Sequence, residues 1–138
     1  MIDKDYGPEP FVVNIEEATV ANDTFRTVGW TGSQLQMTLM SIPVGGDIGL
    51  EVHAENDQFL RIEQGQASVH MGRTPDELTF EVPASDDFAI FIPKGMWHNI
   101  RNTGDVPLKL YSIYAPAHHP FGAVHPTQAD AEAAEQHA

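Results

Sequence analysis

The sequence contains no cysteine. That absence excludes disulfide frameworks, thiolate zinc sites, iron–sulfur clusters and cysteine nucleophiles. Basic residues are also scarce, because seven Lys and Arg stand against twenty Asp and Glu, for a formal net charge of −13 at pH 7. Nucleic acids and anionic membrane surfaces repel such a chain, so we expect neither of them as a partner.

Long apolar runs are missing as well. No stretch approaches the ~18 apolar residues that span a bilayer. The first residues, MIDKDYGPEP, lack the apolar segment that follows a basic one in a secretory signal, so we expect a cytoplasmic protein. The 138 residues, 41% of them hydrophobic, are enough for one domain with one core.

Most of the chain has the pattern of short β-strands. Residues 35–42, 48–53 and 58–63 alternate apolar and polar side chains, as strands with one buried face do. Gly, Pro, Asn and Asp separate these runs from further short ones, which lie at 66–71, 77–82, 88–92 and 108–114. Many short strands between turn residues predict an all-β sandwich or small closed barrel.

Helical signals occur only near the two ends of the chain. Asn14, followed three residues later by Glu17, predicts a short helical turn at 15–21. Thr127 precedes an acidic, alanine-rich segment and predicts a helix over roughly 128–136.

These signals divide the chain into three parts. We expect an N-terminal arm at 1–23, a β-barrel at 24–116, and a C-terminal arm with an acidic helix at 117–138. The segment 115–126 holds three Pro and three His and is expected to be irregular.

Four side chains are candidate metal ligands. Glu51 and His53 lie on the same face of a predicted strand, because strand side chains repeat every two residues. Gln58 follows after a short turn, and His98 follows the Pro-Lys-Gly turn at 93–95. Imidazole nitrogen with carboxylate oxygen suits zinc, iron, manganese or nickel. On an ordinary strand, however, Glu-x-His is simply the solvent-facing side.

The wider spacing favours the metal site. Gly45, five residues, Glu51-x-His53, four residues, Gln58, six residues and Gly65 form a first motif, and Pro93-x-Gly95, two residues, His98, three residues and Asn102 form a second. This arrangement resembles the two sequence motifs of the cupin superfamily. The resemblance covers about 45–102 and implies a jelly-roll barrel of two sheets, with one divalent transition metal held in the lumen by Glu51, His53, Gln58 and His98.

The sequence departs from the superfamily pattern at three positions. Glu51 stands where the first His is usual, Gln58 stands where the Glu is usual, and Asp87 replaces the Gly that opens the second motif. Compared with the usual pattern, the acidic ligand has moved from position 58 to position 51, and a neutral ligand has moved from position 51 to position 58. The ligand set therefore keeps the single negative charge that helps to hold a divalent cation.

The ligand set is also similar to that of phosphomannose isomerases, a cupin branch that mixes Gln, His and Glu. This resemblance implies isomerase- or epimerase-like chemistry on a small, oxygen-rich, sugar-like molecule, with the metal as a Lewis acid. An iron-dependent dioxygenase-type cupin and a non-catalytic cupin that binds a small ligand remain alternatives. A barrel this small leaves apolar strand faces that commonly pair with a second copy, so we expect a homodimer.

No catalytic base can be assigned from the sequence. His119 and His125 are weak candidates, because the segment 115–126 either folds over the mouth of the barrel and offers an acid or base, or packs outside it or on a partner subunit. Arg61, between two apolar residues of a predicted strand, is expected to point out of the barrel into a surface ion pair. His70 lies on the next strand and faces either way.

Overall fold

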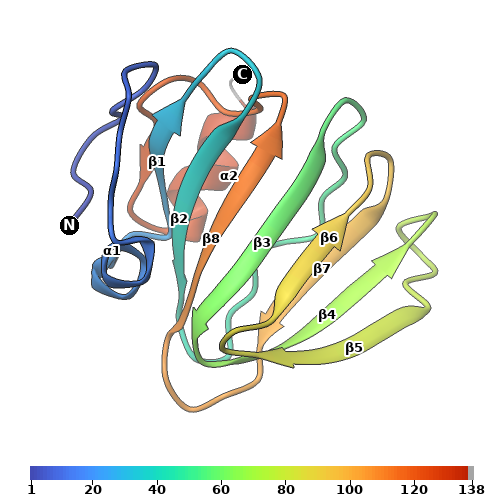
Figure 1. Ribbon diagram of the computed structural model, residues 1–138. Helices are drawn as coiled ribbons and strands as arrows, with labels where there is room; N and C mark the ends of the chain where they lie inside the picture. The colour runs from blue at the N-terminus through green and yellow to red at the C-terminus, as the bar shows by residue number, and fades with distance from the viewer. Residues whose placement is uncertain (137–138) are drawn as a thin grey trace.

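Two antiparallel sheets face each other in the computed structural model, which describes residues 1–136 (Figure 1). The helices are α1 (Ile15–Ala21) and α2 (Gln128–Gln136). The strands are β1 (Arg26–Thr31), β2 (Gln36–Ile42), β3 (Asp57–Gln64), β4 (Gln66–Gly72), β5 (Phe80–Ser85), β6 (Ala89–Ile92), β7 (Trp97–Asn102), β8 (Leu108–Ala115) and β9 (Val124–His125). The larger sheet has the order β6-β3-β8-β2-β1-β9 and the smaller β5-β4-β7. The predicted all-β class with short terminal helices is confirmed.

Strand alternation places the core between the two sheets. On β3, Gln58, Leu60 and Ile62 are buried, whereas Phe59 and Arg61 face outward. The main apolar cluster contains Leu60 and Ile62 and draws on every strand from β2 to β8. A second cluster on the outer face of the larger sheet is covered by the N-terminal arm and α1, and its buried members are Ile2, Ala18, Met37 and Leu39.

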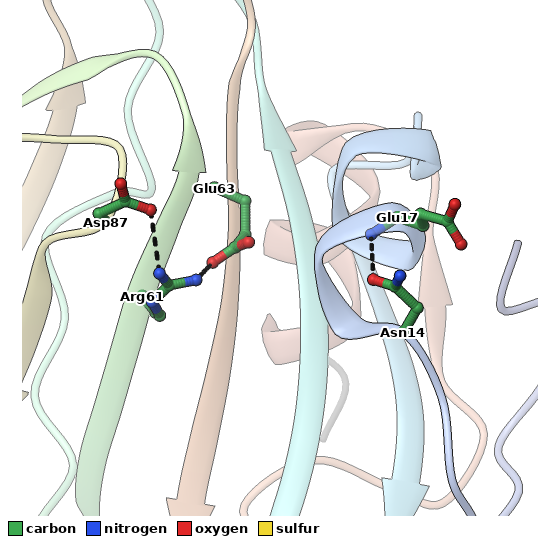
Figure 2. A network of polar contacts seen from close by, with 5 residues as sticks. All are labelled: Asn14, Glu17, Arg61, Glu63 and Asp87. Carbon is green, nitrogen blue, oxygen red and sulfur yellow. Dashed lines mark hydrogen bonds and ion pairs between the residues drawn. The ribbon is translucent and has the colours of Figure 1, made fainter.

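Both helices have the predicted N-terminal caps. The backbone N–H of Glu17 donates to Asn14 Oδ1 at 3.1 Å (Figure 2). At α2 the backbone N–H of Asp130 donates to Thr127 Oγ1 at 3.2 Å. In Figure 1 α2 lies behind β1, β2 and β8. Ala131 joins the core between the sheets, so α2 closes part of one end of the barrel. Within residues 1–136 neither helix has the length and apolar character needed to cross a bilayer.

Three local expectations were wrong. Residues 48–53 are not a regular strand, because Gly49 adopts φ +90° and only isolated bridges at Asp47 and Glu51 join the segment to β7. The run predicted at 77–82 starts at Phe80 and continues to Ser85. The segment 115–126 is not wholly irregular, because β9 pairs with β1.

Arg61 points out of the barrel, as expected. Its guanidinium makes an ion pair with Asp87 at 3.0 Å and a second with Glu63 (Figure 2). Asp87 has φ +74°, a left-handed conformation that glycine adopts freely and Asp tolerates better than most residues. Asp87 therefore adopts a glycine-like backbone conformation at the position where the motif has glycine.

We predict that Leu60→Ala lowers the free energy of unfolding by about 2–5 kcal/mol. Leu60 is fully buried, so the substitution leaves a cavity in the core between the sheets. Leu35→Ala is the matched control, since Leu35 is 41% exposed and should cost below about 1 kcal/mol. Urea denaturation of both variants checks this. Equal losses would contradict the placement of the core.

Candidate metal centre

A pair of backbone hydrogen bonds brings the two motifs together. The N–H of Glu51 donates to the carbonyl of His98 at 3.0 Å, and the N–H of His98 donates back to the carbonyl of Glu51 at 2.9 Å. The N–H of Gly95 also donates to the carbonyl of His53 at 2.8 Å. The irregular segment at 48–53 is thereby fixed to β7 and to the turn before it.

Three of the four predicted ligands lie together. The ligand atoms of Glu51, His53 and His98 all lie within 4.8 Å of one another. Glu51 Oε1 lies 3.6 Å from the Nε2 atom of each histidine. Both histidines are buried, and the carboxylate side chain is 16% exposed. Residues that are 47 positions apart in the sequence thus form one polar cluster inside the barrel.

Three of the four ring nitrogens of His53 and His98 form no hydrogen bond within the described residues. His98 Nδ1 donates to the carbonyl of Met96 at 3.0 Å, which directs the opposite ring nitrogen, Nε2, toward Glu51 Oε1 at 3.6 Å. Within residues 1–136, His98 Nε2 and both ring nitrogens of His53 are buried without a hydrogen-bond partner. Unpartnered buried polar atoms are costly, and a coordinated cation would relieve them. The cluster therefore fits a divalent transition metal.

Gln58, the predicted fourth ligand, has a buried amide oxygen without a partner among the described residues. It is buried on the inner face of β3, and its Nε2 donates to Ser112 Oγ at 2.8 Å. The amide oxygen, Oε1, is buried and has no partner among the described residues. Its cross-strand neighbour on β8 is Tyr114, whose ring centroid lies 5.4 Å from that of His53. That Gln58 is a ligand remains a prediction.

The charge of the cluster resides on Glu51. Burial raises the pKa of this carboxyl, but its interactions with the His53 and His98 imidazoles outweigh burial and bring the pKa well below its ordinary value. Glu51 is therefore ionised at neutral pH. The cluster keeps the single negative charge expected from the exchange of acid and neutral group.

The segment 115–126 folds over the mouth of the barrel, which was one of the two alternatives. Gln36 holds it there, because its Oε1 accepts from the backbone N–H groups of His118 and His119 at 3.0 and 2.8 Å. Gln36 Nε2 also donates to the carbonyl of His119 at 2.8 Å. The arm forms one wall of an open cavity of about 350 Å³, which is lined by Glu51, Val52, His53, His118, His119, Pro120, His125, Ala134 and Glu135.

The two weak base candidates both line this cavity. Burial lowers the pKa of His119 to about 2, and it also lowers the pKa of His125. The histidine nearest the cluster is His118, whose ring centroid lies 4.2 Å from that of His53. Burial and His53 lower the pKa of His118 as well. All three imidazoles are neutral at pH 7, and His118 was not singled out by the sequence.

The sequence analysis also missed Arg26, which lies on the inner face of β1 and is 2% exposed. Its backbone pairs with Met40 of the core, which fixes the direction of its side chain. A charged residue at an apolar-face position was the available signal, but the run around it is too short to show which face is buried.

His70, which the sequence left open, lies on the outer face of β4. Its Nε2 lies 2.9 Å from Ser68 Oγ on the same face.

Comparison with known proteins agrees with this architecture. A family model described as a cupin domain matches residues 38–114. The chain belongs to the cupin family. The protein YrkC of Bacillus subtilis (strain 168), which is uncharacterised, is 63% identical over 132 residues, covering 96% of this chain and 71% of YrkC. The predicted small single-domain cupin is confirmed.

Two further relatives support the assignment. The uncharacterised protein L612 of Acanthamoeba polyphaga mimivirus is 42% identical over 115 residues, covering 83% of this cupin and 70% of L612. The crystal structure of BH2720 from Bacillus halodurans is 60% identical, with a TM-score of 0.94 over 95% of this chain and 99% of that one.

The burial of His119 predicts a pH-dependent stability in metal-free protein. Unfolded chains protonate this imidazole near pH 6.5, whereas the folded protein resists protonation until about pH 2. The unfolded state therefore binds more protons between these values, and stability falls with pH below about 6.5 by up to about 1 kcal/mol per unit. His119→Gln should reduce the slope between pH 6.5 and 4.5 in urea titrations. An unchanged slope would contradict the burial of this ring.

Proposed function

We propose that this cupin binds one divalent transition metal through Glu51, His53, Gln58 and His98 and carries out isomerase- or epimerase-like chemistry on a small, oxygen-rich, sugar-like molecule. The observation that carries the proposal is the set of three unpartnered, buried ring nitrogens of His53 and His98 beside the ionised carboxylate of Glu51. The buried, unpartnered amide oxygen of Gln58 supports it as the fourth ligand. Zinc, manganese, iron and nickel all accept these donors. When bound, the cation would supply Lewis-acid polarisation of a carbonyl or hydroxyl oxygen.

The chain supplies groups that can move a proton beside that site. His118 lies against His53, and its ring centroid is 4.7 Å from that of His119. The pKa of His118 is lowered by burial, so this imidazole is neutral at pH 7 and has a lone pair that can take a proton. A base next to a polarised hydroxy-carbonyl compound is the minimal requirement for proton transfer between adjacent carbons. His118 is the base in this proposal, because its ring lies against that of His53.

The cavity restricts the size of the substrate. Its volume of about 350 Å³ is at the lower end of the range of small-molecule sites, which suits a compound of sugar size or smaller. Pro120 and Ala134 line it beside the polar groups, so a bound compound is partly shielded from water.

An iron-dependent dioxygenase is the second candidate function. The specific observation in its favour is that Glu51, His53 and His98 match the two-histidine, one-carboxylate set of non-haem iron oxygenases. Oxygen consumption by iron-loaded protein with a bound organic substrate would favour this candidate over isomerisation.

The metal site is tested by His53→Ala, with metal content measured by elemental analysis after purification without added metal. We expect the variant to lose at least nine-tenths of the metal while its circular dichroism and oligomeric state stay as in the wild type, since the core lies elsewhere. His70→Ala, on the outer face of β4, is the matched control and should retain the metal. Equal metal content in both variants would reject the assignment.

Proton transfer is tested by incorporation of deuterium from D₂O into small hydroxy-aldehydes and hydroxy-ketones, followed by NMR. We expect metal-dependent exchange at the carbon next to the carbonyl, reduced about 10²-fold or more in His118→Ala. Elemental analysis of the same variant should show unchanged metal. Exchange that persists in His118→Ala would remove this residue from the base role.

A further inference from the structure

Arg26 is a buried cation with an incomplete set of partners. It lies on the inner face of β1, only 2% of its surface is exposed, and its Nε has no hydrogen-bond partner in the described part of the chain. None of the ion pairs formed within residues 1–136 includes it. Burying a guanidinium without a direct counter-ion is costly, and proteins normally place a carboxylate or phosphate against one.

The space beside Arg26 adjoins the candidate metal centre. A pocket of about 120 Å³ is lined by Arg26, and Glu51 lines both this pocket and the larger cavity. Glu135 of α2 likewise lines both. The smaller pocket therefore adjoins the cavity at Glu51 and Glu135, and Arg26 lines it.

We propose that Arg26 binds the carboxylate of the substrate, which makes the substrate a small hydroxy acid or keto acid rather than a neutral sugar. The proposal rests on the proposed function for the position of the substrate's remaining oxygens at the metal site. A planar guanidinium donates two parallel hydrogen bonds to a carboxylate, which fixes both position and orientation.

The charges around the pocket favour a carboxylate over a phosphate. Glu51, Glu132 and Glu135 line the same pocket, so negative charge already surrounds Arg26 without contacting it closely. A singly charged group gains the guanidinium contact with less repulsion from these glutamates than a doubly charged phosphate meets. The pocket is also small and includes Phe25 and Ile48, which suits the compact carboxylate.

The test compares Arg26→Met with Arg101→Met, because Arg101 is an exposed arginine on β7. The probes are glycolate, its neutral counterpart glycolamide, and inorganic phosphate, each titrated by calorimetry into metal-free and zinc-loaded protein. We expect glycolate affinity to fall at least tenfold in Arg26→Met and to stay unchanged in Arg101→Met. Glycolamide should bind all three proteins equally, and phosphate should bind the wild type more weakly than glycolate.

Thermal unfolding without any probe separates a ligand-binding arginine from a structural one. If Arg26 awaits a ligand, Arg26→Met replaces an unpaired buried charge with an apolar side chain and should unfold at the same or a higher temperature. A lower unfolding temperature would show that Arg26 is paired within the fold and would overturn the proposal. Glycolate affinity within twofold of wild type in Arg26→Met would also overturn it, as would tighter binding of phosphate than of glycolate.

The same titrations keep the two proposals apart. Arg26-dependent glycolate binding in a protein that takes up no metal would support the anion site and contradict the proposed function. Normal metal uptake with glycolate binding that does not depend on Arg26 would support the metal site of the proposed function and contradict the anion site at Arg26.

Discussion

The site depends on one backbone interaction, the reciprocal pair of hydrogen bonds between Glu51 and His98. Glu51 belongs to a segment that is not a regular strand, so no sheet ladder positions its side chain. The two hydrogen bonds between Glu51 and His98 position the segment instead. The hydrogen bond from the N–H of Gly95 to the carbonyl of His53 adds a third backbone contact. As a result, a carboxylate and two imidazoles from two motifs that are far apart in the sequence lie within 4.8 Å of one another. The apolar core between the sheets makes this attachment rigid, since β7 contributes Ile100 to it.

Electrostatics then decides what the cluster can do. Glu51 stays ionised because the His53 and His98 imidazoles and the charge of Arg26 lower its pKa, and the carbonyl of Met96 fixes the orientation of the His98 ring. With the neutral amide of Gln58 as the proposed fourth ligand, the set has one negative charge, which is the charge that the usual cupin ligands carry. A divalent cation would leave the cluster with one net positive charge, which favours an oxygen-rich and electron-donating ligand. The arm that Gln36 holds over the mouth adds imidazoles that are neutral at pH 7, so it lines the cavity with polar rings without adding charge.

Much of this structure follows from the sequence, and the exceptions have identifiable causes. Alternation around Leu60 placed the core face of β3 correctly, and Asn14 marked the start of α1. The spacing of the two motifs predicted the Glu51, His53 and His98 cluster. In the structure, backbone hydrogen bonds between Glu51 and His98 join the two motifs. Alternation failed at 48–53, since it does not register the positive φ of Gly49. His118 and Arg26 were missed for a different reason: the contact of His118 depends on Gln36, and the inward direction of Arg26 depends on the register between β1 and β2.

The most direct test of the metal centre is X-ray diffraction at the manganese, iron, nickel and zinc absorption edges, on crystals of protein purified without added metal. The account predicts one anomalous peak roughly 2.0–2.3 Å from His98 Nε2, a His53 ring nitrogen and a Glu51 oxygen. It also predicts that Gln58 Oε1 faces that peak. A density map with no anomalous peak there, or with the peak bound elsewhere, would contradict the account.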